Sequence, residues 1–176
     1  MTAGVAVRVA DADRDWTTWR DLRLRALRDS PSAFASTYER EVGFTETQWR
    51  QRVGGDGVAV LATVSGDPVG MAGGFRDLPG LLHVIAMWVD PVHRRRGVSR
   101  ALLRGLEEWA DAHGLRLHLD VNTSNTAART SYERYGFVAT GETRPLREGS
   151  REVVERMVLS REPAARRAGS ACADLR

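Results

Sequence analysis

The sequence predicts an α/β protein, because stretches with the spacing of strands alternate with stretches with the spacing of amphipathic helices along its 176 residues. Leucine and valine alternate strictly with polar residues over 115–121, as in a strand with one covered face. Between Gly97 and Gly114, leucine, tryptophan and alanine instead fall on one helical side. Hydrophobic residues make up 42% of the chain. We therefore expect a single domain over residues 1–160 and a disordered, alanine- and arginine-rich tail over 161–176.

The first part of the domain is expected to begin with a strand and to continue with helices. A strand over residues 5–9 precedes a helix that Asp13 or Asp15 caps and that runs to about Arg28. A capping box opened by Thr45 then predicts a separate helix.

The middle of the chain predicts a hairpin followed by a more apolar strand. Apolar residues over 58–64 and 69–75 flank a Ser-Gly-Asp-Pro turn, which is typical of two antiparallel strands. Residues 81–89 form a nearly continuous apolar run, so we expect a strand that is covered on both faces. His83 is the one conspicuous polar residue in that run.

One helix and two strands are expected after the alternating strand. The residues from Asn122 to Asn125 are typical of helix starts, and the helix that they begin is expected to end at Gly136. Strands are expected over residues 137–140 and 152–159, with a loop between them.

Composition argues against several classes of protein. The chain has one cysteine, Cys172, so neither a disulfide framework nor a thiolate metal site can form within it. No apolar run approaches the length of a membrane span, and acidic residues stand where a signal peptide needs its apolar core. We therefore expect a cytoplasmic protein with no membrane partner.

The charge of the chain does not predict a nucleic-acid-binding protein. The chain has 26 basic residues, all of them arginine, against 23 acidic ones, which gives a formal net charge of +3. Acidic residues are interleaved with the arginines nearly everywhere, so no long basic stripe forms. No nucleic-acid partner is expected, and an arginine-rich nucleic-acid module is the least favoured alternative.

The most informative segment is a basic loop between a predicted strand and a predicted helix. It reads VDPVHRRRGVSR over residues 89–100. The start of a helix presents backbone N–H groups without intrahelical partners and the positive end of the helix dipole. Gly97 lets the backbone approach a ligand closely. The segment therefore predicts an anion-binding loop that suits phosphate groups.

A second motif follows in residues 125–137, which read NTAARTSYERYGF, an N-x-x-A-x-x-x-Y-x-x-x-G-F pattern. This motif and the preceding R-x-x-G-x-S loop, in this order, resemble the GNAT superfamily of N-acetyltransferases. The usual loop of that superfamily is Q/R-x-x-G-x-G/A, and Ser99 replaces its final small residue. The resemblance is firm over residues 81–137 and extends with less specific features over 5–159.

The resemblance implies the GNAT fold, a mixed and twisted sheet of six or seven strands flanked by about four helices. The fourth and fifth strands of that fold splay apart, and acetyl-CoA, the acetyl donor, lies in the gap; no metal is implied. The pyrophosphate of acetyl-CoA would lie mainly on main-chain N–H groups. The residues that the resemblance places against the cofactor are Met87, Trp88, Val89, Arg94, Arg95, Arg96, Gly97, Val98, Ser99, Arg100, Asn125, Ala128 and Arg129.

Two side chains are candidates for the proton transfers that the implied reaction needs. Tyr132 has the chemistry to protonate a leaving thiolate, because a phenol with a pKa of about 10 stays protonated at neutral pH. His83 stands where the histone-acetylating branch of the family has its glutamate base, and histidine titrates near neutrality. The alternatives are that Tyr132 is an ordinary core tyrosine and that His83 is structural, with a water chain as the base.

The remaining histidines and three glutamates have plainer interpretations. No carboxylate or cysteine stands at metal-ligand spacing from the other histidines, which we interpret as surface or sheet-face residues: His93, His113 and His118. The glutamates that either attract a cationic acceptor or form a solvated face are Glu39, Glu41 and Glu46.

The sequence therefore predicts an enzyme that moves the acetyl group of acetyl-CoA to a primary amine of a small molecule or a protein. A non-catalytic acyl-CoA sensor, in which the cofactor loop is kept without turnover, is the main alternative. A homodimer is one of the assemblies that remain open.

Overall fold

The computed structural model describes residues 4–160, and the expected tail over 161–176 lies outside them. The strands are β1 (Val5–Val9), β2 (Gly57–Val64), β3 (Asp67–Phe75), β4 (Leu81–Val89), β5 (Arg116–Asn122), β6 (Phe137–Pro145) and β7 (Val153–Leu159). The helices are α1 (Ala12–Asp29), α2 (Tyr38–Glu41), α3 (Glu46–Gly54), α4 (Val98–Ala112) and α5 (Thr126–Tyr135). Single 3₁₀ turns are η1 (Pro31–Ala33) and η2 (Pro91–His93).

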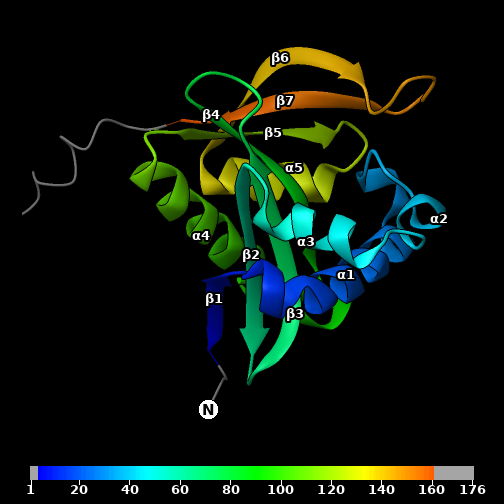
Figure 1. Cartoon of the computed structure of the whole chain (residues 1–176). Helices are drawn as coiled ribbons and strands as arrows, with labels where there is room; N and C mark the ends of the chain where they lie inside the picture. The colour runs from blue at the N-terminus through cyan, green and yellow to red at the C-terminus, as the bar shows by residue number, and fades with distance from the viewer. Residues whose placement is uncertain (1–3, 161–176) are drawn as a thin grey trace, which may run out of the picture.

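The seven described strands form one mixed sheet in the order β1-β2-β3-β4-β5-β7-β6 (Figure 1). Every neighbouring pair is antiparallel except β4 and β5, which are parallel. This sheet confirms the predicted α/β class and the expected number of strands. The described residues form five α-helices, one of them a single turn, where about four were expected.

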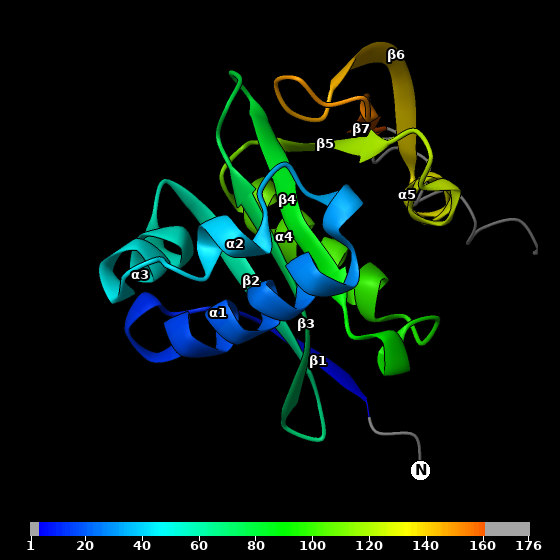
Figure 2. The same ribbon diagram turned by 90° about the vertical axis from the view of Figure 1, so that its right-hand side faces the viewer.

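Helices cover both faces of the sheet. Figure 2 shows α1, α2 and α3 on one face and α4 on the other. Two apolar clusters match these faces, one with Trp19 and Trp49 under α1 and α3, the other with Leu102 and Leu106 under α4. Each such buried side chain contributes roughly 1.5–3 kcal/mol. Within the described residues, no helix has both the length and the apolar composition of a membrane span.

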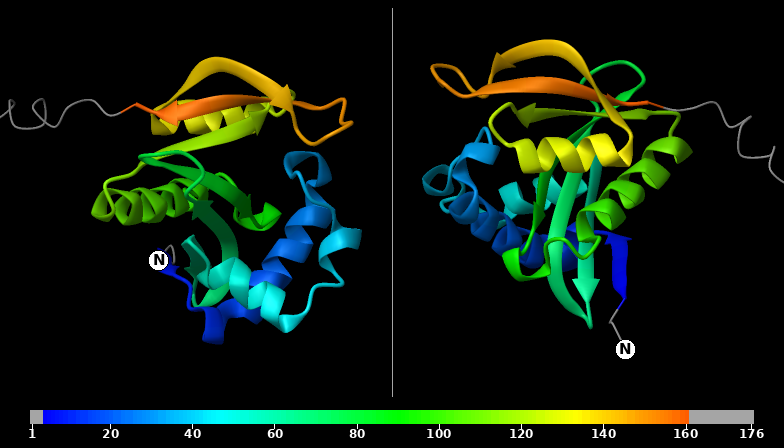
Figure 3. Two further views of the ribbon diagram at one scale, coloured as in Figure 1. Left: turned by 45° about the horizontal axis from the view of Figure 1, so that its top comes forward. Right: turned by 180° about the vertical axis from the view of Figure 1, so that it is seen from behind.

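β4 and β5 form a fork. They pair only through Leu81–Arg116, Leu82–Leu117 and His83–His118, and then separate. Figure 3 shows β5, β7 and β6 as an arm that stands apart from β2, β3 and β4, with α5 packed beneath it.

The middle of β4 is not covered on both faces, so that expectation was wrong for this segment. Its pairing with β3 shifts by one residue here, and Ala86 adopts a left-handed backbone with a φ of +53°. Ile85 is 39% exposed, and Ala86 and Met87 are half-buried. The fork leaves this part of the strand without a neighbour on one edge, and these three residues line the cavity that opens there.

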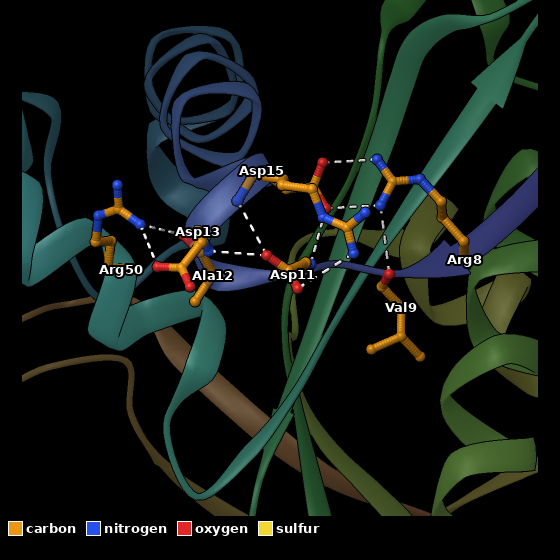
Figure 4. A network of polar contacts seen from close by, with 8 residues as sticks. Arg8, Val9, Asp11, Ala12, Asp13, Asp15 and Arg50 are labelled. Carbon is orange, nitrogen blue, oxygen red and sulfur yellow. Dashed lines mark hydrogen bonds and ion pairs between the residues drawn. The ribbon is translucent and has the colours of Figure 1, made fainter.

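α1 begins two to four residues earlier than predicted, because Asp11 caps it in place of Asp13 or Asp15 (Figure 4). The Asp11 side chain accepts hydrogen bonds from the N–H groups of Asp13 and Arg14, each at 3.0 Å. Asp15 is buried and accepts two hydrogen bonds of 2.6 Å from Arg8 of β1. The first turn of α1 is therefore attached to the first strand of the sheet.

β6 is longer than the expected strand over 137–140. It continues through Gly141, which has a φ of +80°, and pairs with β7 on both sides of an irregularity between Ala139 and Thr143. Judged from its sequence neighbours alone, Gly141 indicates the end of a strand. Pairing with β7 overrides that local signal and shortens the expected loop.

Glu41 does not form part of a solvated face, because it is buried in an ion pair with Arg23. It is 0% exposed and accepts hydrogen bonds from Arg23 at 3.0 and 2.8 Å. Burial favours its protonated form, but the Arg23 guanidinium outweighs that effect and lowers the pKa of Glu41. Glu39 and Glu46 are exposed, as a solvated face requires, and Glu46 pairs with Arg50 at 2.8 Å.

We expect Glu41→Ala to lower the free energy of unfolding by roughly 3–5 kcal/mol, because it leaves the buried Arg23 charge uncompensated. Glu39→Ala, in the same short helix but exposed, should change stability by no more than about 0.5 kcal/mol. Chemical denaturation of both variants measures the difference, and equal costs would contradict the assigned role of Glu41.

Candidate active site

A cavity of about 500 Å³ opens between the arms of the fork. Met87 of β4 lines it from one arm, and Asp120 and Asn122 of β5 line it from the other. Tyr132 of α5 and His83 of β4 also reach its wall. Both catalytic candidates from the sequence therefore lie on the same cavity, although 49 residues of chain separate them.

The side chains of Trp88 and Arg94 are bound to α1 and do not face the cavity. The Trp88 indole is buried and donates a hydrogen bond of 2.9 Å to Asp29. The Arg94 guanidinium also bonds Asp29 and donates to the carbonyl of Val89 at 3.0 Å. Trp88 can therefore contact a ligand through its backbone groups. The Arg94 side chain instead holds the basic loop in place.

The loop after η2 presents unpaired backbone N–H groups. Arg95 and Gly97 have left-handed backbones, with φ values of +62° and +83°. Within the described part of the chain, no acceptor takes the N–H groups of residues 95–100, and the first intrahelical bond is donated by Ala101 to Gly97 at 3.0 Å. Consecutive free N–H groups at a helix start form a concave anion site.

Three guanidinium groups surround this loop. Arg95 and Arg96 are exposed and make no ion pair with any described residue, and Arg100 lies over the ring of Tyr135 at 5.5 Å. Val98 is buried in the core, and Ser99 is half-buried in the first turn of α4. A second hollow, of about 620 Å³, lies between this loop and α5. The charges and the hollow together suit a polyanionic ligand.

The second motif forms the start of α5. The Asn125 side chain accepts a hydrogen bond of 3.1 Å from the Ala128 N–H, so it caps the helix as the sequence predicts. Asn125 and Ala128 also line the 500 Å³ cavity. Arg129 is committed to protein carboxylates, because it bonds Glu133 at 3.0 Å and also Glu155 of β7.

Tyr132 is suited to donate a proton. Its ring packs edge-on against Phe137 with the ring centroids 5.8 Å apart. Its hydroxyl makes no hydrogen bond to any described residue, and burial raises its pKa to about 12. The phenol is therefore protonated at neutral pH.

His83 is suited to accept a proton. Its Nδ1 lies 3.1 Å from Asp77 Oδ2, and its Nε2 lies 3.6 Å from Asp120 Oδ2. Burial lowers the pKa of His83 below its ordinary value of 6.5, His118 and Arg144 add to this effect, and Asp120 and Asp77 oppose it. The imidazole is therefore neutral at pH 7.

The structure corrects the sequence-based interpretation of His118, which found no carboxylate at metal-ligand spacing from it. It is fully buried, stacks on His83 with centroids 4.5 Å apart, and has its Nε2 2.7 Å from Asp77 Oδ1. The carboxylate therefore exists, but it stands 41 residues earlier in the chain. His113 is exposed and stacks on Trp109, as a surface histidine does.

Comparison with known proteins places this geometry in a family. The family model described as "Acetyltransferase (GNAT) family" matches residues 16–137. A mycothiol acetyltransferase of Kytococcus sedentarius is 31% identical over 138 residues, which cover 78% of this chain and 46% of that protein. The chain thus spans about half the length of the curated relatives that it matches.

Solved structures share the fold. A GNAT-family acetyltransferase of Streptococcus pneumoniae superposes with a TM-score of 0.69 at 21% identity, over 88% of this chain and 98% of that one. A Bacillus anthracis protein, solved in complex with acetyl coenzyme A, superposes with a TM-score of 0.57 at 21% identity, over 64% and 68% of the two chains.

Proposed function

The chain belongs to the GNAT acetyltransferase family, and from that premise we propose that it transfers the acetyl group of acetyl-CoA to a primary amine. The observation that carries this proposal is that the forked cavity and the anion-binding loop both adjoin β4, the cavity beside its unpaired edge and the loop after its last residue. The fork leaves an edge of β4 unpaired beside the cavity, and the next loop presents six consecutive free N–H groups, those of residues 95–100. Acetyl-CoA has the matching parts, an extended amide-bearing arm and a pyrophosphate.

In the proposed binding mode, the cofactor residues contribute backbone groups, charged side chains or support for the loop. The pyrophosphate lies on the N–H groups that follow Arg94, with Arg95, Arg96 and Arg100 adding charge-assisted contacts. The pantetheine arm runs along the backbone of β4 from Met87 to Val89 and faces the start of α5 at Asn125 and Ala128. Trp88 and Arg94 contribute by backbone groups and by holding the loop.

The proposed chemistry is a direct transfer. The amine nitrogen attacks the thioester carbonyl carbon, the new C–N bond forms, and His83 takes a proton from the amine. The C–S bond then breaks, and the thiolate of coenzyme A takes its proton from the Tyr132 hydroxyl. Both groups start in the protonation state that this sequence needs at neutral pH.

A small-molecule amine is the first acceptor class to test. The relatives at about 31–33% identity are named mycothiol acetyltransferases, after a thiol rather than after a protein, and they are about twice as long as this chain. A panel of small amines and of peptides with free N-termini or lysines, assayed by thiol release from acetyl-CoA, tests this directly. Saturable cofactor binding without turnover on any amine would instead support the acyl-CoA sensor.

Acetyl-CoA at about 100 times its Kd should stabilise the protein by about 2.7 kcal/mol, a rise in Tm of roughly 5–10 °C. Gly97→Glu should abolish this rise, because it places a carboxylate at the anion loop on a backbone with a φ of +83°. Gly43→Glu, at an open and exposed position, should keep it. A folded wild-type protein whose Tm ignores acetyl-CoA would contradict the cofactor assignment.

Tyr132→Phe should lower kcat by on the order of 100-fold with little change in the affinity for acetyl-CoA, because only the proton donor is lost. Tyr38→Phe, remote from the cavity lining, is the matched control. Since the pKa of Tyr132 is raised to about 12, its ionisation should cause no fall in kcat below about pH 10. A retained rate in Tyr132→Phe would leave the tyrosine with a packing role only.

His83→Gln should lower kcat/KM by about 10²-fold or more at pH 7. A base acts in its neutral form, so wild-type kcat/KM should rise with pH through a value below 6.5 and then level off, and the variant should lack this rise. His113→Gln should leave the profile unchanged. If His83→Gln keeps the wild-type profile, His83 is structural and a water chain is the base.

A further inference from the structure

We propose that Asp77, His83 and His118 form a binding site for a divalent transition-metal ion, with Zn²⁺ as the probe, at the point where β4 and β5 separate. Each residue offers one ligand atom, and these atoms all lie within 4.8 Å of one another. Two imidazole nitrogens and one carboxylate oxygen are ligands that Zn²⁺ accepts. Nothing in this proposal depends on the acetyltransferase activity.

The three ligand atoms lie within 4.8 Å of one another, a spread slightly wider than one shared ion allows. Asp77 Oδ1 lies 2.7 Å from His118 Nε2, and Asp77 Oδ2 lies 3.1 Å from His83 Nδ1. Atoms that bind one zinc ion at about 2.0–2.1 Å can be at most roughly 4.2 Å apart. A small rotation of the side chains therefore brings all three atoms to bonding distance, with the ion replacing the hydrogen bond between His118 and Asp77 and the close approach of His83 to Asp77.

The surroundings supply the contacts that support a metal ligand. A histidine that binds metal through one nitrogen usually donates its other N–H to a carboxylate. The carboxylate nearest to the other nitrogen of His83 is Asp120, 3.6 Å from Nε2, which is an ion-pair distance rather than a hydrogen bond; Arg144 and Arg156 hold Asp120 in place with hydrogen bonds of 2.6 and 3.2 Å. The Asp77 side chain is 22% exposed, which gives an ion access from solvent.

His118 limits the expected affinity. Its Nδ1 is buried and has no partner among the described residues. When Nε2 binds the ion, the proton of the neutral ring moves to Nδ1, where no described residue accepts a hydrogen bond. We therefore expect binding in the micromolar range, weaker than in a structural zinc site.

A bound ion would act on the fork itself. His83 and His118 are the last registered pair before β4 and β5 separate, so a shared ion would cross-link the two strands at that point. Zinc should therefore raise the Tm of the protein. It should also lower turnover by occupying His83, and this last effect alone rests on the proposed role of His83 as a base.

The test is a zinc titration of tag-free, chelator-treated protein in competition with a chromophoric chelator. The chain carries Cys172→Ser throughout, so that no thiol contributes. We expect one zinc ion per chain. When Co²⁺ is added in place of Zn²⁺, we expect the visible absorption bands of a Co²⁺ ion with few ligands. Asp77→Asn, a nearly isosteric change, and His118→Gln should each weaken binding by at least the roughly 10–100-fold that loss of an outer-shell partner costs.

His113→Gln is the matched control, because His113 is exposed and is not one of the three proposed ligands. Circular dichroism of the metal-free proteins shows whether each variant is folded. If His118→Gln does not fold, the comparison of the wild type with Asp77→Asn still tests the proposal. Equal zinc affinity in the wild type and in folded Asp77→Asn would overturn the proposal, as would the lack of saturable one-to-one binding.

Discussion

The separation of β4 from β5 after the His83–His118 pair is the constraint on which the rest of the site depends. Two strands that diverge leave backbone N–H and C=O groups on facing edges that neither strand can pair. Water or an extended ligand has to bond them, and the cavity lies at this place. The end of the β5 arm is attached to η1, because the Asn122 amide donates a hydrogen bond of 3.0 Å to the carbonyl of Ser32.

One carboxylate links the fork to the anion-binding loop. Asp29, the last residue of α1, accepts hydrogen bonds from the Trp88 indole, from Arg94 and from the Ser30 hydroxyl. Burial favours its protonated form, but these bonds outweigh it and lower the pKa of Asp29. The first arginine of the R-x-x-G-x-S motif is thus a clamp between loop and helix in this chain, and Arg95 and Arg96 keep their charges free for a ligand.

Sequence reasoning predicted the features that neighbouring residues encode. The helix start after Gly97, the Asn125 cap and the end of α5 at Gly136 follow from residue types within one helical turn. The features that it missed depend on residues far apart in the chain: Asp77 meets His118 across 41 positions, and Arg23 meets Glu41 across 18. No spacing rule reaches that far, because such contacts follow from strand order and helix packing.

The two side chains to which we assign proton transfers approach the cavity from different elements. His83 lies at the closed end of the fork on β4, and Tyr132 projects from α5 beneath the other arm. Their relative position is therefore set by how far the arms open, and the stacked His83 and His118 rings fix the point from which they open. The same divergence that leaves backbone groups unpaired also places a proton acceptor and a proton donor on one cavity, so the local loss of sheet pairing and the proposed chemistry have a single structural cause.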